Sequence, residues 1–351
     1  MIRNQWYAIL DSKDVKPGKP IGVTRMGEKL VVWRDSQNQV CCMADRCPHR
    51  GAALSLGTIQ DNHITCPFHG FEFDSSGACQ YIPANGRNAA VPKAMRGRAY
   101  PAKDRHGLIW MYWGETPSEE LPPIRFFDVL DSSYTYSTIQ DHWPAHYSRA
   151  IENQLDVVHL PFVHRTTIGR GNRKVVDGPW TEWDCEFDET CNLLNVWLHN
   201  RVEDGTRARR EKDMPRPDKH PQLQFIFPNV WHNWISDDVH VFAAFAPIDD
   251  ENTQMIVRFY QRFMKLPVLS HIVNAISAPF NRIVLDQDKH VVATQIPKRS
   301  DLRIGERLIP GDLPIITYRK KRRELIDASA QEIDETIAEK ERGADDLRSP
   351  A

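Results

Sequence analysis

The sequence is poor in cysteine, nearly balanced in charge, and without a long apolar run. Seven cysteines in 351 residues are too few, and odd in number, for a secreted disulfide scaffold, so they point to metal or redox chemistry. A formal net charge of -2 provides no field that would attract nucleic acid or an anionic membrane. No run of about eighteen apolar residues predicts a membrane helix, and the polar first residues lack a signal-peptide core. We therefore expect a cytoplasmic globular protein with no nucleic-acid or membrane partner.

Two nucleotide and redox motifs are also missing. The sequence contains neither the G-x-G-x-x-G motif of a dinucleotide-binding fold nor the cysteine spacing of a plant-type ferredoxin. Nicotinamide, flavin and a second iron–sulfur cluster are therefore not expected, and any reducing electrons must come from another protein. The length of 351 residues exceeds that of one ordinary domain and predicts two domains, or one domain with a large partner.

Two short segments of similar composition carry the first candidate metal site. C-P-H-R-G at 47–51 and C-P-F-H-G at 66–70 each supply one thiolate and one imidazole. Two thiolates on one iron and two imidazoles on the other are the ligands of a Rieske [2Fe–2S] cluster. A structural zinc site is the alternative, but zinc fingers usually pair Cys with Cys and His with His. The predicted cluster ligands are Cys47, His49, Cys66 and His69.

The other five cysteines have no ligand spacing. We predict that they are buried, inert thiols, which is the usual state of an isolated cysteine in a protein core. They are Cys41, Cys42, Cys79, Cys185 and Cys191.

A second candidate metal site follows the pattern E-x₃-D-x₂-H-x₄-H. Glu152, Asp156 and His159 stand at helical spacing, which predicts one helix face. Pro161 should interrupt the helix and let His164 turn back toward His159. Two imidazoles and one carboxylate form the facial triad of non-haem iron enzymes, which leaves coordination positions open for O₂. Two ordinary core histidines are the alternative interpretation.

The third ligand is expected in the helical segment 281–295, which contains two acids. Asp288 shares its face with valine and leucine residues, whereas Asp286 lies among charged residues. A carboxylate in apolar surroundings needs a partner, and a divalent metal is a strong one. We therefore predict Asp288 as the metal ligand and Asp286 as a solvated acid.

Both patterns together resemble the α-subunits of Rieske non-haem iron oxygenases, over about residues 4–327. The resemblance implies that His159, His164 and Asp288 bind a mononuclear Fe(II). It implies that Asp156 bridges a cluster histidine of one subunit to an iron-ligand histidine of its neighbour, which requires a ring of subunits, expected to be a homotrimer. Asn153 matches a position beside the iron or the substrate, and Glu152 is expected to cap or orient its helix.

The expected architecture is α+β. Residues 1–115 should form an all-β Rieske [2Fe–2S] domain, and 116–327 a catalytic domain of the helix-grip type, in which an antiparallel sheet curves around a long helix. Residues 328–351 are expected to be a charged, disordered tail. The strands are predicted at 6–10, 29–34, 39–43, 107–114, 222–236, 240–247 and 255–263.

The resemblance also implies the reaction. A reductase that uses NAD(P)H, or a ferredoxin, would supply electrons, and a small organic substrate would be monooxygenated, by C–H hydroxylation or by N- or O-demethylation. The stretch Q-D-K-x-V-V-x-x-Q-x-P resembles the monooxygenase and demethylase branch. The alternatives are cis-dihydroxylation of an arene and a Rieske electron-transfer protein without catalysis of its own.

Two further features leave their interpretation open. The basic run Arg319 to Arg323 is either a solvated face or a docking site for an acidic electron donor. A group of aromatic residues is either pocket wall or ordinary core. They are Phe225, Phe227, Trp231, Trp234 and Phe245.

Overall fold

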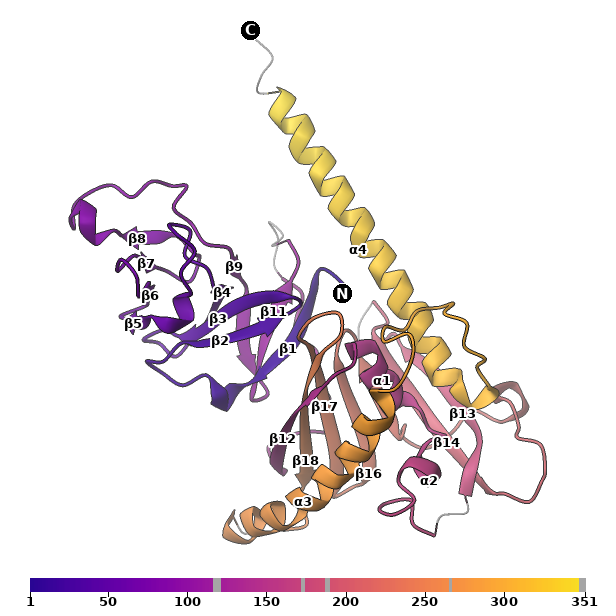
Figure 1. Cartoon of the computed structure of the whole chain (residues 1–351). Helices are drawn as coiled ribbons and strands as arrows, with labels where there is room; N and C mark the ends of the chain where they lie inside the picture. Colours follow the sequence, from indigo (N-terminus) through magenta and orange to yellow (C-terminus); the bar gives the residue numbers. More distant parts are fainter. Residues whose placement is uncertain (116–120, 172–173, 187–189, 265–266, 347–351) are drawn as a thin grey trace.

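The computed structural model describes residues 1–115, 121–171, 174–186, 190–264 and 267–346. An N-terminal unit of three small sheets lies beside a unit built on one large sheet (Figure 1). This is the expected α+β architecture. The predicted boundary between residues 115 and 116 adjoins residues 116–120, which lie outside the described ranges. No helix among the described residues is long and apolar enough to cross a membrane.

The N-terminal unit is entirely β-structure apart from short 3₁₀ turns. Its three sheets are antiparallel, and the predicted strands at 6–10, 29–34, 39–43 and 107–114 coincide with four of their members to within a residue or two. In sheet order, the first sheet contains β1 (Gln5–Asp11), β11 (Leu108–Trp113) and β10 (Ala102–Arg105). The second contains β2 (Ile21–Arg25), β3 (Glu28–Arg34), β4 (Val40–Ala44) and β9 (Ala99–Tyr100). The third contains β5 (Thr58–Gln60), β6 (His63–Thr65), β7 (Glu72–Phe73) and β8 (Cys79–Tyr81).

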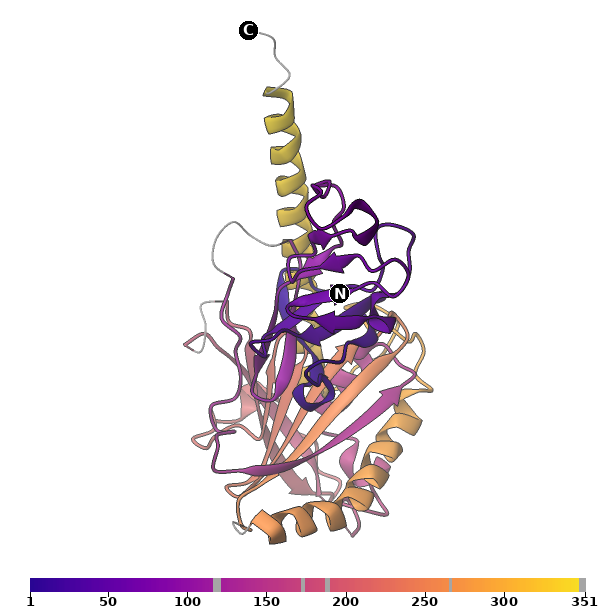
Figure 2. The same cartoon turned by 90° about the vertical axis from the view of Figure 1, so that its left-hand side faces the viewer.

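The second unit is one seven-stranded antiparallel sheet with helices on one face (Figures 1 and 2). Its helices are α1 (Tyr147–Leu155), the short α2 (Leu160–Val163), α3 (Pro267–Val292) and α4 (Leu313–Asp346). Its strands, in sheet order, are β12 (Thr135–Trp143), β18 (Thr253–Gln261), β17 (Val239–Pro247), β16 (Val230–Ser236), β15 (Leu223–Ile226), β14 (Leu193–Val202) and β13 (Lys174–Asp184).

Both faces of this sheet are buried. Along β17, Ala243 and Phe245 pack beneath the helices, whereas Phe242 and Ala244 pack against the N-terminal unit. Residues of β1 and β11, including Trp6 and Trp110, cover that second face. A strand buried on both sides favours apolar residues at successive positions, which explains the continuous apolar run at 241–247.

Two buried polar side chains fasten the units together. Asn229 donates from Nδ2 to the Ala8 carbonyl at 2.8 Å and accepts from the Ala8 N–H at 3.1 Å. Arg258 donates to the His106 carbonyl at 2.7 Å and contacts Asp11 Oδ2 at 3.3 Å. Because these groups are buried and make hydrogen bonds to the other unit, they fix the relative placement of the two sheets.

The structure corrects two predicted elements. Segment 222–236, predicted as one strand, is the hairpin β15–β16, because Phe227, Pro228 and Asn229 interrupt the pairing. The tail predicted at 328–351 is helical through Asp346, since α4 crosses the predicted boundary without a break. Figure 1 shows this helix leaving the body of the molecule.

Candidate metal centres

The two Cys-His segments fold into loops with the same hydrogen-bond pattern. In each loop the cysteine N–H donates to a carbonyl five residues later, at 2.8 Å in both cases. Its carbonyl accepts from the N–H of the glycine four residues later, at 2.8 Å for Cys47 and 3.0 Å for Cys66. Gly51 and Gly70 have φ of 77° and 72°, a left-handed conformation that strains residues with a Cβ. The loops therefore require these glycines.

The loops separate the four predicted cluster ligands into two pairs. Cys47 and Cys66 are buried, whereas the imidazoles of His49 and His69 are exposed, with ring centroids 4.6 Å apart. Burial raises the pKa of Cys47 to about 11, and a bound metal cation would stabilise its thiolate.

This separation bears on the zinc alternative. A single metal ion needs all its ligand atoms close together. Among the described residues, the potential ligand atoms of His159, His164 and Asp288 lie within 4.8 Å of one another, whereas those of the four Cys-His residues do not form such a group. A two-iron cluster accommodates a buried thiolate pair and a separate imidazole pair.

The chain around the second site turns sharply at Asp156. Helix α1 ends at Leu155, and Asp156 Oδ1 accepts from the N–H groups of Val158 at 2.7 Å and His159 at 3.2 Å. An aspartate that captures backbone N–H groups in this way competes with helix continuation. The prediction of one helix carrying Glu152, Asp156 and His159 on one face is therefore wrong.

Pro161 lies in the first turn of α2, where a missing N–H costs nothing, so it helps to begin a second helix instead of interrupting the first. His159 and His164 flank this short helix at its two ends. The sharp turn and the one-turn helix together bring both imidazoles to the same side.

His159, His164 and Asp288 converge on one point. Asp288 Oδ1 lies 3.5 Å from His159 Nε2 and 3.1 Å from His164 Nε2, and the ligand atoms all lie within 4.8 Å of one another. Asp288 is only 4% exposed and lies on the buried face of α3 with Leu285 and Val292, whereas Asp286 is exposed. Asp288 Oδ1 is buried and makes no hydrogen bond within the described residues. Such an arrangement suits a divalent cation.

Charged and polar neighbours surround this triad. Burial opposes ionisation of Asp156, but the His159 imidazole and two backbone N–H groups lower its pKa. The distance from His159 Nδ1 to Asp156 Oδ1 is 3.9 Å, too long for a hydrogen bond. Asn153 Nδ2 is buried close by in sequence on α1 and has no partner among the described residues.

Of the two roles predicted for Glu152, capping is not observed. Its carboxylate does not cap α1 but accepts from Arg319 Nε at 2.7 Å and from the second Arg319 nitrogen at 2.8 Å, while Arg149 lies 3.2 Å away. Arg319 and Arg322 are 4% and 2% exposed. The run from Arg319 to Arg323 is therefore not a uniformly solvated face, and two of its cations cannot dock a partner.

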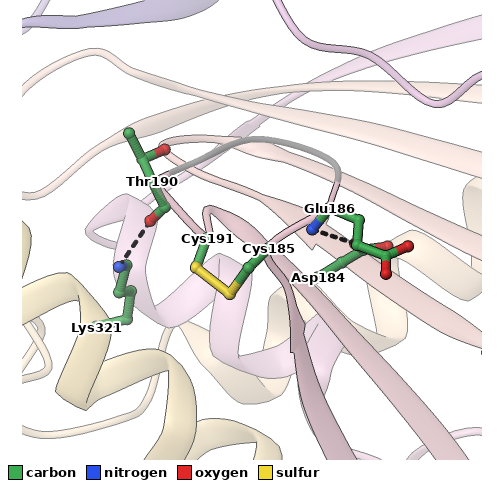
Figure 3. The surroundings of a disulfide bond; sticks show 6 residues. All are labelled: Asp184, Cys185, Glu186, Thr190, Cys191 and Lys321. Atoms are coloured by element: carbon green, nitrogen blue, oxygen red, sulfur yellow. Dashed lines mark hydrogen bonds between the residues drawn. A yellow bond between two sulfur atoms is a disulfide. The ribbon is translucent and has the colours of Figure 1, made fainter.

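Cys185 and Cys191 form a disulfide in the loop between β13 and β14, so the prediction of buried thiols is wrong for this pair (Figure 3). Beside it, the Thr190 carbonyl accepts from Lys321 Nζ of α4 at 2.9 Å. The prediction is confirmed for Cys41, Cys42 and Cys79, which are free and buried, with burial raising the pKa of each thiol.

The aromatic group is mostly core. Four of its members pack in the cluster between the large sheet and its helices, and only Trp234 is partly exposed, stacked on His220 at 3.8 Å. The four buried residues are Phe225, Phe227, Trp231 and Phe245.

Paired Cys-His loops on a small β-unit, followed by two histidines and an aspartate beneath a helix-covered sheet, define a Rieske-type oxygenase. Family models agree: residues 5–95 match the Rieske [2Fe–2S] domain and 143–328 the C-terminal domain of vanillate O-demethylase oxygenase. The chain therefore belongs to the Rieske non-haem iron oxygenases, as an α-subunit, and its Rieske domain implies a [2Fe–2S] cluster.

Two relatives of the chain are named demethylases. The methylxanthine N1-demethylase of Pseudomonas putida is 27% identical over 344 residues, covering 93% of this chain and 90% of the relative. Its solved structure has a TM-score of 0.72 at 24% identity, covering 94% and 92% of the two chains. The oxygenase component of dicamba O-demethylase from Stenotrophomonas maltophilia is 32% identical over 165 residues, which span about half of each protein, 47% of this chain and 48% of the relative.

Proposed function

We propose that this chain is a terminal oxygenase that removes a methyl group from nitrogen or oxygen of a small organic substrate. The convergence of His159, His164 and Asp288 on one point carries the proposal, because a triad of this composition binds iron and leaves positions open. The names of the two relatives, an N-demethylase and an O-demethylase, support demethylation over simple hydroxylation. In the balanced reaction, methylated substrate, O₂, two electrons and two protons give demethylated product, formaldehyde and water.

The residues of the site have distinct tasks in this proposal. His159, His164 and Asp288 would hold a mononuclear Fe(II), which when bound supplies the activation of O₂. Gln154 Nε2 lies 3.4 Å from Asp288 Oδ2, so the second carboxylate oxygen has a donor of its own while Oδ1 faces the histidines. Asn153 would place its amide beside the iron or the substrate; the Nδ2 of this amide has no partner in the described part of the chain.

Electron delivery would occur between subunits. The cluster loops lie at the end of the N-terminal unit that faces away from the large sheet, far from α2 (Figures 1 and 2). His49 and His69 are exposed there, and the ring of Phe68, which is 57% exposed, lies 4.0 Å from that of His69. We propose that this face docks on a second copy in a homotrimer, where His49 or His69 donates to Asp156. An NAD(P)H-dependent reductase or a ferredoxin would reduce the cluster.

The experiment is an oxygen-uptake assay with a surrogate reductase and panels of N-methyl, O-methyl and unmethylated aromatic compounds. Formaldehyde released in a 1:1 ratio to the O₂ consumed supports demethylation, whereas a cis-diol product would show that the enzyme is a dihydroxylase instead. If the cluster is reduced but no compound causes O₂ uptake, the protein is an electron carrier. Metal content separates an oxygenase from a carrier, with about three irons per chain for the oxygenase and about two for the carrier.

A further inference from the structure

Gln287, which directly precedes Asp288 on α3, makes three hydrogen bonds beside the second metal site. Its Oε1 lies 2.9 Å from His164 Nδ1 and accepts from Thr167 Oγ1 at 2.7 Å. Its Nε2 donates to Thr166 Oγ1 at 2.8 Å. The amide is thus held on both sides by the loop that follows α2, and it faces the ring nitrogen of His164 that points away from Asp288.

These contacts determine which nitrogen of His164 carries the proton. An imidazole that binds a metal through Nε2 keeps its proton on Nδ1 and needs an acceptor there. Gln287 Oε1 can only accept, so it matches a protonated Nδ1 and disfavours the tautomer that would place a proton on Nε2. The same hydrogen bond restricts rotation of the ring.

The other imidazole has no such hydrogen bond in the described ranges of the chain. His159 Nδ1 is buried without a hydrogen-bond partner among the described residues, and Asp156 is 3.9 Å away. One histidine of the pair is therefore held by its own subunit, and the other adjoins the carboxylate proposed to connect with the neighbour. The side of the site that holds a metal ligand in place, at His164, is therefore different from the side proposed to receive the electron, at His159.

We propose that Gln287 is a positioning residue that orients His164 and thereby sets the affinity of the triad for a divalent metal, without a part in the electron path through Asp156. This inference rests on the proposed metal-binding role of His159, His164 and Asp288. Since Gln287 and Asp288 are neighbours on α3, one helix turn supplies a ligand and also fixes a second ligand, His164, which directly follows α2. A neutral amide does so without adding negative charge beside the Asp288 carboxylate.

The test measures Co(II) binding to protein that contains its cluster but has been freed of mononuclear metal, by competition with a chelator and from the visible d–d spectrum. Gln287→Leu should weaken binding about 10- to 100-fold, the usual effect of removing a partner of a metal-bound histidine. Gln287→Glu, which keeps an acceptor, should bind within about threefold of the wild type or more tightly. The EPR signal of the reduced cluster should be identical in all proteins and confirms that they are folded.

Gln140→Leu is the matched control. Gln140 is a half-buried glutamine that donates to Asp14 at 2.7 Å, away from the triad, so this variant should bind Co(II) like the wild type. Wild-type affinity in Gln287→Leu, or equal loss in the Leu and Glu variants, overturns the inference. Asp288→Ala tests the metal site separately from the role of Gln287. If this variant still binds Co(II) normally, the proposed metal site is wrong, and the proposed role of Gln287 is wrong with it.

Discussion

Single side chains decide how the second candidate metal site is built. Asp156 ends α1 by capturing two backbone N–H groups, and this turn allows His159 and His164 to face Asp288. The same carboxylate is proposed to connect the site with the neighbouring cluster. Its structural and electronic tasks can be separated, because asparagine keeps the Oδ1 acceptor and the shape of aspartate but loses its charge.

We predict that Asp156→Asn retains both metals but loses turnover by about 100-fold, the upper range for partners of metal-bound histidines. The reductase should still reduce the cluster at the wild-type rate, and the delay should appear only when the reduced protein is mixed with substrate and O₂. Rapid-mixing absorbance of the cluster checks this, with iron content measured on the same sample. Wild-type turnover would exclude Asp156 from the electron path.

The residue types of the site could be predicted from sequence because they occur in short, local patterns. Asp288 was distinguishable from Asp286 since helical spacing alone sets which of them faces the core. Glu152 was not predictable in the same way: Arg319, its partner, lies 167 residues away, and nothing local indicates that the two side chains meet. The loss of helix after Leu155 was missed because a side-chain capture of N–H groups competes with apolar periodicity.

At the level of elements, the buried pair Glu152–Arg319 connects α1 with α4. Both side chains are almost completely buried, and Glu306 also contacts Arg319 at 2.6 Å. Removing one member of a buried pair leaves an uncompensated charge in a poorly solvated place. The pair therefore couples the helix that leads into Asp156 to the C-terminal helix.

We predict that Glu152→Ala lowers the free energy of unfolding by about 3–5 kcal/mol. The control is Glu182→Ala, which breaks the exposed pair with Arg216 (2.9 Å) and should cost less than about 1 kcal/mol. Urea unfolding followed by tryptophan fluorescence checks both. Equal effects of the two variants would contradict the importance of burial.

The strands β16 and β17 carry a buried histidine pair that predicts a pH effect. His232 and His240 are fully buried, with Nε2 and Nδ1 2.9 Å apart, and burial lowers the pKa of His232 to about 3. The unfolded chain binds a proton at His232 below its ordinary pKa of 6.5, whereas the folded protein does not. Stability is therefore complete above that pH and declines as the pH falls toward 3.

At pH 5.5 this pKa difference should cost about 1.4 kcal/mol relative to neutral pH. His232→Gln removes the titrating group, so the loss of unfolding free energy between pH 7.5 and 5.5 should be smaller by that amount. His146, which is also buried with its pKa lowered to about 2, stays in both proteins and cancels in the comparison. An unchanged pH dependence would contradict the prediction.

At the level of the whole molecule, sequence patterns predicted the order of the two units, because strand periodicity and the metal motifs are local. The packing of β1 and β11 across the outer face of the large sheet was not predictable. It depends on Asn229 and Arg258, whose partners in the N-terminal unit are more than 150 residues away. The helical course of α4 beyond residue 327 was missed, since a charged, weakly patterned segment does not differ locally from a disordered one.

The separation of the two centres within one chain leads to a complementation test. His69→Ala should lose the cluster but keep the mononuclear site, and Asp288→Ala should do the reverse, so each homotrimer is inactive. Co-expression with two different affinity tags isolates trimers that contain both variants. In a ring of three, every mixed trimer has one junction at which an intact cluster meets an intact mononuclear site, so activity should return to about a third of wild type. No chain in these trimers carries both centres. If the mixed trimers are completely inactive although every remaining cluster and mononuclear site is loaded, electron transfer occurs within a subunit and the proposed assembly is refuted.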